Sequence, residues 1–271
     1  MNKRGLKKPK GNLKLAGIFF AAVFVIFFIS LLFKFLFVVR QSIYDSSQNF
    51  ILEVSDEKNK EILLFLPNHS ISTLKIEGDT SNINVNKLVG IPQEGYLTTG
   101  SLEDSASAII SKSILNYRNI KTNLTILDLL RLFLVSATVS QNQVQTKSVS
   151  INLDISEIDK TLSRFFVEEA IEKENNAIEI VNGTDVLGLG NRLARLVVNM
   201  GGNVVSVRTA DKQTAVSGIL YAGEKDYTVS RLSKVLGFKV EKTTYKTLAD
   251  ITIVIGLDTL SSLQESRPSD K

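Results

Sequence analysis

The chain has 271 residues, of which 44% are hydrophobic, and its 32 basic and 28 acidic side chains give a formal net charge of +4. The positive excess is confined to residues 1–40, which hold eight basic residues and no acidic one, so residues 41–271, with 24 basic and 28 acidic residues, carry −4. This distribution excludes a nucleic-acid-binding protein of the usual basic kind. The lack of cysteine excludes disulfide bonds, so packed cores must stabilise the fold.

A long apolar segment near the N-terminus predicts a transmembrane anchor over residues 15–39. Lys34 is its one charged residue, near the outer end, where the long side chain can extend to the lipid headgroups. A helix of this length reaches roughly 37 Å, which is enough to cross a hydrocarbon core of about 30 Å. A cleaved signal peptide is the alternative, but its apolar core would be shorter and a small-residue cleavage site would follow it.

Six basic residues precede the apolar segment, within residues 1–14. By the positive-inside rule they keep this short tail in the cytoplasm. The sequence therefore predicts a single-pass protein of the cell membrane, with an uncleaved signal-anchor and all later domains extracytoplasmic.

Residues 50–170 are expected to form an α/β domain after a short polar linker, 41–49. Alternating and apolar runs predict strands over 50–54, 61–66 and 73–77, and the Gly-, Asn- and Ser-rich residues 78–90 predict a loop.

Three hydroxyl-to-carboxylate spacings predict helix starts within this domain. They are Ser101 to Asp104, Thr125 to Asp128 and Ser156 to Asp159, and each precedes apolar residues at helical intervals. The apolar helix after Thr125 is too short to cross a membrane, so a core helix is expected there.

A second α/β domain is expected over 177–258, separated from the first by a polar, acidic linker at 171–176. Its elements follow the order βαββαβ, which predicts a ferredoxin-like α/β sandwich. Residues 259–271 are expected to be a disordered tail. The strands are predicted at 177–181, 203–208, 217–221 and 250–256, with a minor strand at 238–243, and the helices at 184–200 and 226–236.

This second domain resembles the LytR C-terminal domain. The segment IEIVNGTDVLGLGN, from Ile178 to Asn191, is similar to the family's opening strand, Asn-Gly-Thr turn and Gly-Leu before the first helix. The resemblance continues through 201–207, 218–237 and 249–258. It implies a bacterial protein of the cell envelope.

A fainter resemblance links residues 50–170 to the LytR-CpsA-Psr (LCP) domain, an extracytoplasmic module that transfers polyprenyl-linked glycopolymers to the cell wall. The segment from Gly90 to Leu97 is similar to the family's Gly-(Ile/Val)-Pro-x-x-x-Tyr pattern. After Pro67, however, Asn68 and His69 stand where the family has Arg-Asp. Because guanidinium groups hold pyrophosphate through bidentate charged contacts, this departure predicts a degenerate LCP-like domain.

The residues present no catalytic constellation, no metal site and no cofactor motif. His69 is the single histidine and lies in a turn-like stretch, so a surface role is expected for it. A glycine-containing turn between a strand and a helix could hold an anion on its backbone N–H groups, although it fits neither the P-loop nor the dinucleotide pattern. If the chain has a ligand site, it is expected at Asn182, Gly183, Thr184 and Arg192.

Two functional hypotheses follow. The first is a membrane-anchored, non-catalytic cell-envelope protein that binds a wall polymer or an envelope protein, with the lipid bilayer as its other partner and no nucleic acid. The second is an LCP-type glycopolymer transferase or polyprenyl-pyrophosphate phosphatase with a diverged site, using arginines 118, 131 and 164. The second requires these arginines to converge on one cavity.

Overall fold

The computed structural model describes residues 13–140, 143–244 and 249–259. The predicted cytoplasmic tail, 1–14, and the predicted disordered tail, 259–271, lie almost wholly outside the described residues.

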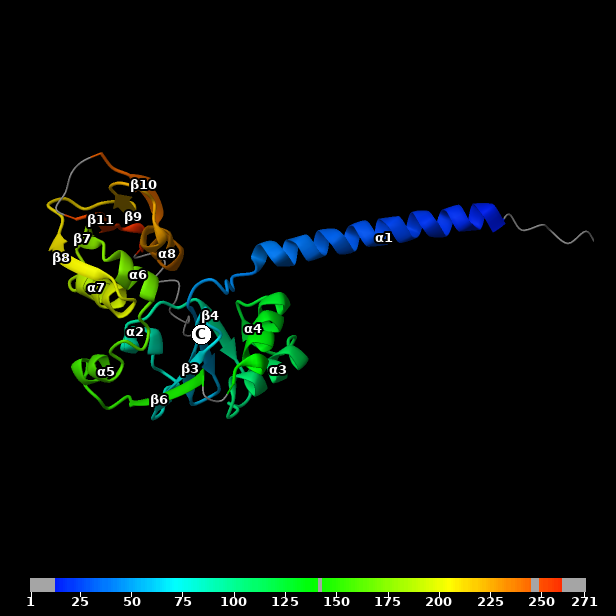
Figure 1. The fold of residues 1–271 in the computed structure, drawn as a ribbon, viewed down its shortest axis with the longest axis horizontal. Helices are drawn as coiled ribbons and strands as arrows, with labels where there is room; N and C mark the ends of the chain where they lie inside the picture. Colours follow the sequence, from blue (N-terminus) through cyan, green and yellow to red (C-terminus); the bar gives the residue numbers. More distant parts are fainter. Residues whose placement is uncertain (1–12, 141–142, 245–248, 260–271) are drawn as a thin grey trace, which may run out of the picture.

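A single long helix, α1 (Leu13–Gln41), projects from the folded part of the chain (Figure 1). Residues Ala16–Gln41 are long and apolar enough to cross a membrane, and none of their most apolar stretch is buried against the protein. No other helix of the described residues meets both conditions. These properties confirm the predicted long apolar helix near the N-terminus, which suggests a single-pass membrane protein.

Residues 50–150 form the first sheet, in the strand order β5-β4-β1-β2-β3-β6. The centre is an antiparallel meander, β1-β2-β3, and β4 and β6 join its two edges in parallel. The strands are β1 (Phe50–Ser55), β2 (Lys60–Phe65), β3 (Ile71–Glu77), β4 (Gly95–Thr98), β5 (Lys121–Thr122) and β6 (Val144–Ser150).

The central strands carry apolar side chains on both faces of this sheet, so helices cover both faces. On β1, Leu52 enters the core beneath α3 (Ala106–Leu115) and α4 (Ile126–Thr138). Ile51 enters the opposite core, beneath α2 (Val85–Val89) and α5 (Ile155–Thr161). The first domain is therefore a helix–sheet–helix sandwich.

The local signals placed some helices correctly and others with an error of a few residues. The capping box at Thr125 and Asp128 forms as predicted. The helix after Ser101 instead begins behind the cap Ser105, and the one after Ser156 behind the cap Asp154. The expected loop at 78–90 contains α2, whose N-cap is Asn84.

The expected linker at 41–49 is packed against the first domain. The Asp128 carboxylate accepts hydrogen bonds from Ser42 Oγ at 2.5 Å and from the Tyr44 backbone N–H at 3.0 Å. Tyr44 itself is buried, and its ring packs edge-on against Phe50. These contacts fix the chain directly after α1.

The expected linker at 171–176 is also ordered. Most of it belongs to a short helix, α6 (Glu169–Glu174), in which Ile171 is buried. The Glu174 carboxylate accepts the backbone N–H groups of Tyr227 and Thr228 at 3.0 and 2.8 Å, and so caps a helix of the second domain.

The second sheet has the strand order β10-β9-β11-β7-β8, and one apolar core joins it to α7 and α8. The elements are β7 (Ala177–Asn182), α7 (Leu189–Asn199), β8 (Asn203–Thr209), β9 (Gly218–Tyr221), α8 (Tyr227–Leu236), β10 (Lys239–Lys242) and β11 (Ile251–Ile255). This unit is here called the C-terminal domain.

The strand order differs from the predicted ferredoxin-like sandwich. A ferredoxin-like fold splits each βαβ unit by a strand inserted between its two parallel strands. Here β7 pairs directly with β8, and β9 pairs directly with β10, both in parallel. The short strand β10, expected to be minor, takes the edge position beside β9. The α/β class was predicted correctly, but the connectivity was not.

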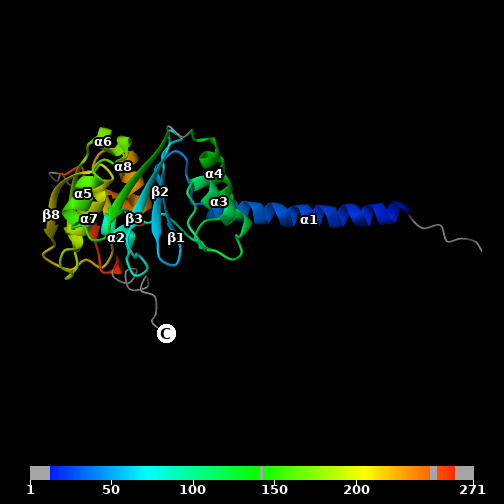
Figure 2. The same cartoon turned by 90° about the horizontal axis from the view of Figure 1, so that it is seen from below.

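Figures 1 and 2 agree on how these parts lie relative to α1. The α3–α4 layer covers the face of the first sheet toward which α1 projects. The helices α2 and α5 and the C-terminal domain lie on the opposite side of that sheet.

Candidate functional site: the cleft between the domains

A buried arginine joins the two domains. Arg231, on α8, is completely buried, and its guanidinium lies 2.6 Å from Glu94 and 2.7 Å from Glu168. It also donates to the backbone carbonyl of Asn49 at 2.8 Å. The Tyr227 hydroxyl, one helical turn earlier, donates to the second oxygen of Glu168 at 2.5 Å.

This cluster has one guanidinium and two carboxylates, so its formal net charge is −1 when both carboxylates are ionised. Burial raises the pKa of Glu168, and the nearby Arg231 charge only partly opposes this effect. Burial acts to lower the pKa of Arg231, but the hydrogen bonds and charges of Glu94 and Glu168 outweigh it and raise that pKa. Burial and the hydrogen bond to Glu168 raise the pKa of Tyr227.

A second group of contacts fastens α7 to the first domain. Arg195 forms a salt bridge with Asp159 at 2.5 Å and donates to the Leu88 carbonyl at 2.8 Å. Asn199 donates to the carbonyls of Val89 and Gly90, both at 3.0 Å. The C-terminal domain thus supplies partners for the free carbonyls at the end of α2.

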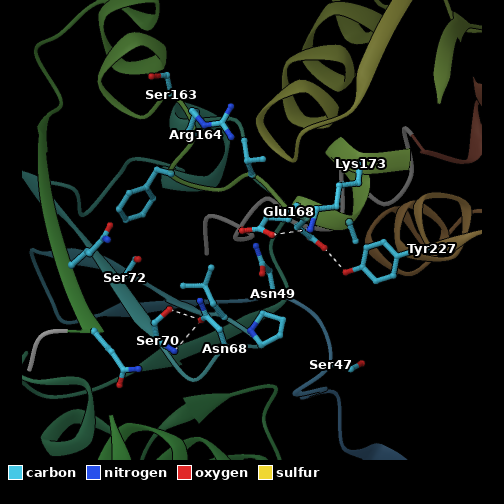
Figure 3. A pocket seen from close by; sticks show the side chains of 18 of the residues that line it. Ser47, Asn49, Asn68, Ser70, Ser72, Ser163, Arg164, Glu168, Lys173 and Tyr227 are labelled. Carbon is cyan, nitrogen blue, oxygen red and sulfur yellow. Dashed lines mark hydrogen bonds and ion pairs between the residues drawn. The ribbon is translucent and has the colours of Figure 1, made fainter. Parts of the chain in front are cut away.

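A cavity of about 900 Å³ lies beside the Arg231 cluster, and we call it the interdomain cleft. Figure 3 shows Ser163 and Arg164 on one side, Asn68 and Ser70 on the opposite side, and Glu168 and Tyr227 toward the C-terminal domain. The lining side chains are mostly amides, hydroxyls and cations, supplied by segments distant in sequence. They include Ser47, Asn49, Asn68, Ser70, Ser72, Gln143, Gln145, Lys147, Ser163, Arg164, Phe165, Glu168, Lys173 and Tyr227.

The cations of the cleft are held in different ways. Lys147 Nζ donates to the Thr161 carbonyl at 3.0 Å and lies 5.5 Å from the centroid of the Phe165 ring. Arg164 forms a bidentate pair with Glu172, and Lys173 pairs with Glu169 at 3.2 Å. Both carboxylate pairs are exposed, so they hold the cations only weakly.

One polar group in the wall of the cleft has no partner. Asn49 is 6% exposed, and its Nδ2 atom lacks a hydrogen-bond acceptor within the described part of the chain. A buried donor left unsatisfied costs about 1–3 kcal/mol.

The predicted ligand residues of the strand-to-helix turn lie in the C-terminal domain, outside the interdomain cleft. The Asn182 side chain accepts the backbone N–H and the hydroxyl of Thr184 and donates to the carbonyl of Val186. Asn182 and Thr184 are both buried. Gly183 has no room for a side chain, because an added Cβ would lie 2.7 Å from Thr214.

Arg192 is exposed on α7 and lies apart from that turn's hydrogen bonds. It lines a second cavity of about 370 Å³ between the domains, together with Leu189, Leu193, Ile91 and Pro92. Arg192 therefore lines a cavity that the three turn residues do not line. Ligand binding at either place stays a prediction.

The three arginines of the alternative hypothesis do not converge. Arg118 and Arg131 belong to the α3–α4 side of the first sheet, whereas Arg164 follows α5 on the opposite face. Arg164 lines the interdomain cleft, and the other two line neither cavity. His69 has a positive φ of 55° and lies in an exposed turn between β2 and β3.

Among the described residues, no group of three or more His, Asp or Glu side chains could hold a metal ion. The cleft itself was missed by sequence analysis. Its one sequence signal is the polar composition of 68–72 and 143–147, which by itself indicates only exposed loop and edge strand.

Comparison with known proteins identifies the C-terminal domain. Residues 176–258 match the family described as LytR cell envelope-related transcriptional attenuator (LytR_C), which confirms the predicted resemblance. No curated protein matches the chain. The crystal structure of the transcriptional regulator yvhJ from Bacillus subtilis is similar at 12% identity and a TM-score of 0.33, over 43% of this chain and 96% of that one, which is too slight to carry an argument. The LCP-like resemblance of 50–170 stays a prediction.

Proposed function

We propose, from the match of residues 176–258 to the LytR_C family, that this protein is a membrane-anchored, non-catalytic component of the bacterial cell envelope. In this proposal α1 crosses the cell membrane once, the basic N-terminal tail is cytoplasmic, and both domains are extracytoplasmic. The interdomain cleft binds a cell-wall polymer.

The observation that carries the proposal is the chemistry of the cleft. Wall polymers are rich in hydroxyl, amide and anionic groups, which are recognised by amides, hydroxyls and cations. The cleft offers these groups mainly from the first domain and α6, and Tyr227 lines it from the C-terminal domain. Its size of about 900 Å³ falls within the range of ligand sites.

Cosedimentation of the detergent-solubilised full-length protein with isolated bacterial cell walls tests the binding. Lys173→Glu places a negative charge on the rim of the cleft, and its exposed pair with Glu169 contributes little to stability. We expect this variant to bind walls more weakly than the unaltered protein. Lys239→Glu is the matched control, because Lys239 is exposed on β10 and lines neither cavity. Equal binding by both variants would contradict the cleft as the site.

The orientation can be tested separately, because the chain has no cysteine. Single substitutions Lys7→Cys and Leu187→Cys each introduce one thiol. In intact cells, a membrane-impermeant maleimide should label the second variant only. Labelling of the first would reverse the proposed orientation without affecting the cleft.

A further inference from the structure

The helix α4 exposes an apolar stripe although it lies in a well-packed layer. Its inner side, with Leu129 and Leu132, is completely buried in the core. On the outer side Leu130 is 44% exposed and Leu134 is 63% exposed, one turn apart. At the end of the neighbouring helix α3, Leu115 is 85% exposed. We call the exposed surface that carries Leu115, Leu130 and Leu134 the outer face of α3–α4.

The N-terminal end of α4 is fastened to the end of α1. Asp128, in the first turn of α4, is completely buried and accepts hydrogen bonds from Ser42 and Tyr44. The residue before Ser42 is Gln41, the last residue of α1. Whatever surrounds the end of α1 therefore also lies next to the start of α4.

The lengths involved place that end at the lipid headgroups. A helix with the 26 residues of Ala16–Gln41 measures about 39 Å, whereas the hydrocarbon core measures about 30 Å. The last residues of α1 then extend into the headgroup region. Figures 1 and 2 both show α3 and α4 on the side toward which α1 projects.

The charge of this layer is suited to an anionic surface. Residues 105–140 contain four basic residues and one acidic residue, and the acidic one is the buried Asp128. Lys112 is paired with Glu103, but Arg118, Lys121 and Arg131 are exposed. Basic residues close to an anionic bilayer are attracted to its surface, and this attraction decreases within a Debye length.

We propose that the outer face of α3–α4 rests on the bilayer that α1 crosses. Leu115, Leu130 and Leu134 would enter the headgroup region, as the apolar side of an interfacial helix does, while the exposed basic residues would meet anionic lipid phosphates. The partner is thus the lipid surface itself. This inference rests on the membrane anchor of the proposed function.

The chain contains no tryptophan, so one introduced tryptophan is a clean reporter. Full-length Leu134→Trp is placed in phosphatidylcholine–phosphatidylglycerol nanodiscs with or without brominated acyl chains. We expect brominated lipid to reduce its emission, and the emission maximum to be blue-shifted. Leu115→Trp should behave alike and serves as the second variant if the first does not fold.

Two further variants separate this inference from its premise. Phe28→Trp lies in the middle of α1 and should be strongly quenched, whereas Leu187→Trp, 93% exposed in the C-terminal domain, should not be quenched. Quenching of Phe28→Trp together with emission from both α3–α4 variants that matches Leu187→Trp would overturn the outer-face contact alone. No quenching of Phe28→Trp would overturn the anchor.

The electrostatic part has its own test in the Leu134→Trp background. Adding Arg131→Glu should reduce the quenching in phosphatidylglycerol-containing nanodiscs, because it replaces attraction by repulsion. Adding Lys239→Glu changes the net charge equally on β10 and should leave the quenching unchanged. Equal effects of the two changes would overturn the contribution of Arg131.

Discussion

Arg231 Nη1 lies 2.6 Å from Glu94 Oε1, and 137 residues separate the two in the sequence. The pair lies at the contact between the domains, and the arginine side chain has no exposed surface. Breaking a buried ion pair by removing one partner is costly, because the other charge stays buried without compensation.

Arg231→Met should therefore lower the free energy of unfolding by about 3–5 kcal/mol, since it leaves both Glu94 and Glu168 without their cation. Urea unfolding of the full-length protein in detergent measures this loss. Arg208→Met is the control, because Arg208 also pairs with a glutamate but is 54% exposed. Its loss should stay below about 1 kcal/mol. Similar losses for the two variants would contradict the larger contribution to stability expected of the buried Arg231 cluster.

Glu168 should give the protein a pH-dependent stability. Burial raises the pKa of Glu168 in the folded state above its ordinary value of 4.5, which applies to the unfolded state. Between the unfolded-state pKa and the folded-state pKa, the folded state therefore binds more protons than the unfolded state. The contribution of Glu168 to the free energy of unfolding is therefore largest below the unfolded pKa and decreases as the pH rises through this window. Glu168→Gln keeps an acceptor for Arg231 and cannot ionise, so its unfolding should lack this decrease. Glu169→Gln, next to it and exposed, should retain the decrease.

Asp128→Ala should release the segment after α1. The Asp128 carboxylate accepts the hydroxyl of Ser42, the backbone N–H of Tyr44, and both the N–H and the hydroxyl of Thr125. Leaving such buried donors unsatisfied costs about 1–3 kcal/mol. Hydrogen exchange should become faster over 42–46, while Asp79→Ala, which removes an acceptor from an exposed turn, should leave this segment unchanged. Unchanged exchange in the first variant would contradict the docking of this segment.

Gly183→Ala tests whether the Asn-Gly-Thr turn has a packing role. An added methyl group would lie 2.7 Å from Thr214 and 2.8 Å from the Ile255 carbonyl, so overpacking should cost about 1–3 kcal/mol. Gly100→Ala meets nothing within 4 Å and should be neutral by comparison. Thermal unfolding distinguishes them. A neutral Gly183→Ala that loses wall binding would instead support the predicted ligand site.

The sequence predicted elements whose signal is local. The long apolar helix was located within two residues at each end, because length and apolar composition determine it. The first two strands, with Phe50 and Leu64 among their apolar residues, were located within one residue at each end. The cap at Thr125 was found because both partners are three residues apart.

The features that depend on distant pairing could not be predicted in the same way. The order of elements in the C-terminal domain is compatible with more than one strand order, and the pairing of β7 with β8 decides between them. Arg231 stands beside the core residue Leu232, but a charged side chain in a helix usually indicates an exposed position, and its burial here depends on Glu94 and Glu168, which are distant in the sequence. The interdomain cleft follows from that same contact, so no local pattern announces it.

In the proposed arrangement, with α1 across the membrane, the docking of Ser42 and Tyr44 determines how far the protein extends from the bilayer. A flexible linker of nine residues would have a root-mean-square end-to-end distance of about 15–18 Å, and the domains could move over that range. Here residues 41–49 pack against the first domain, so in the proposed arrangement the distance from the bilayer to the cleft is determined by packed helices and strands and not by a flexible chain. A polymer held there would be kept at a fixed spacing from the membrane, and the protein would act as a rigid spacer.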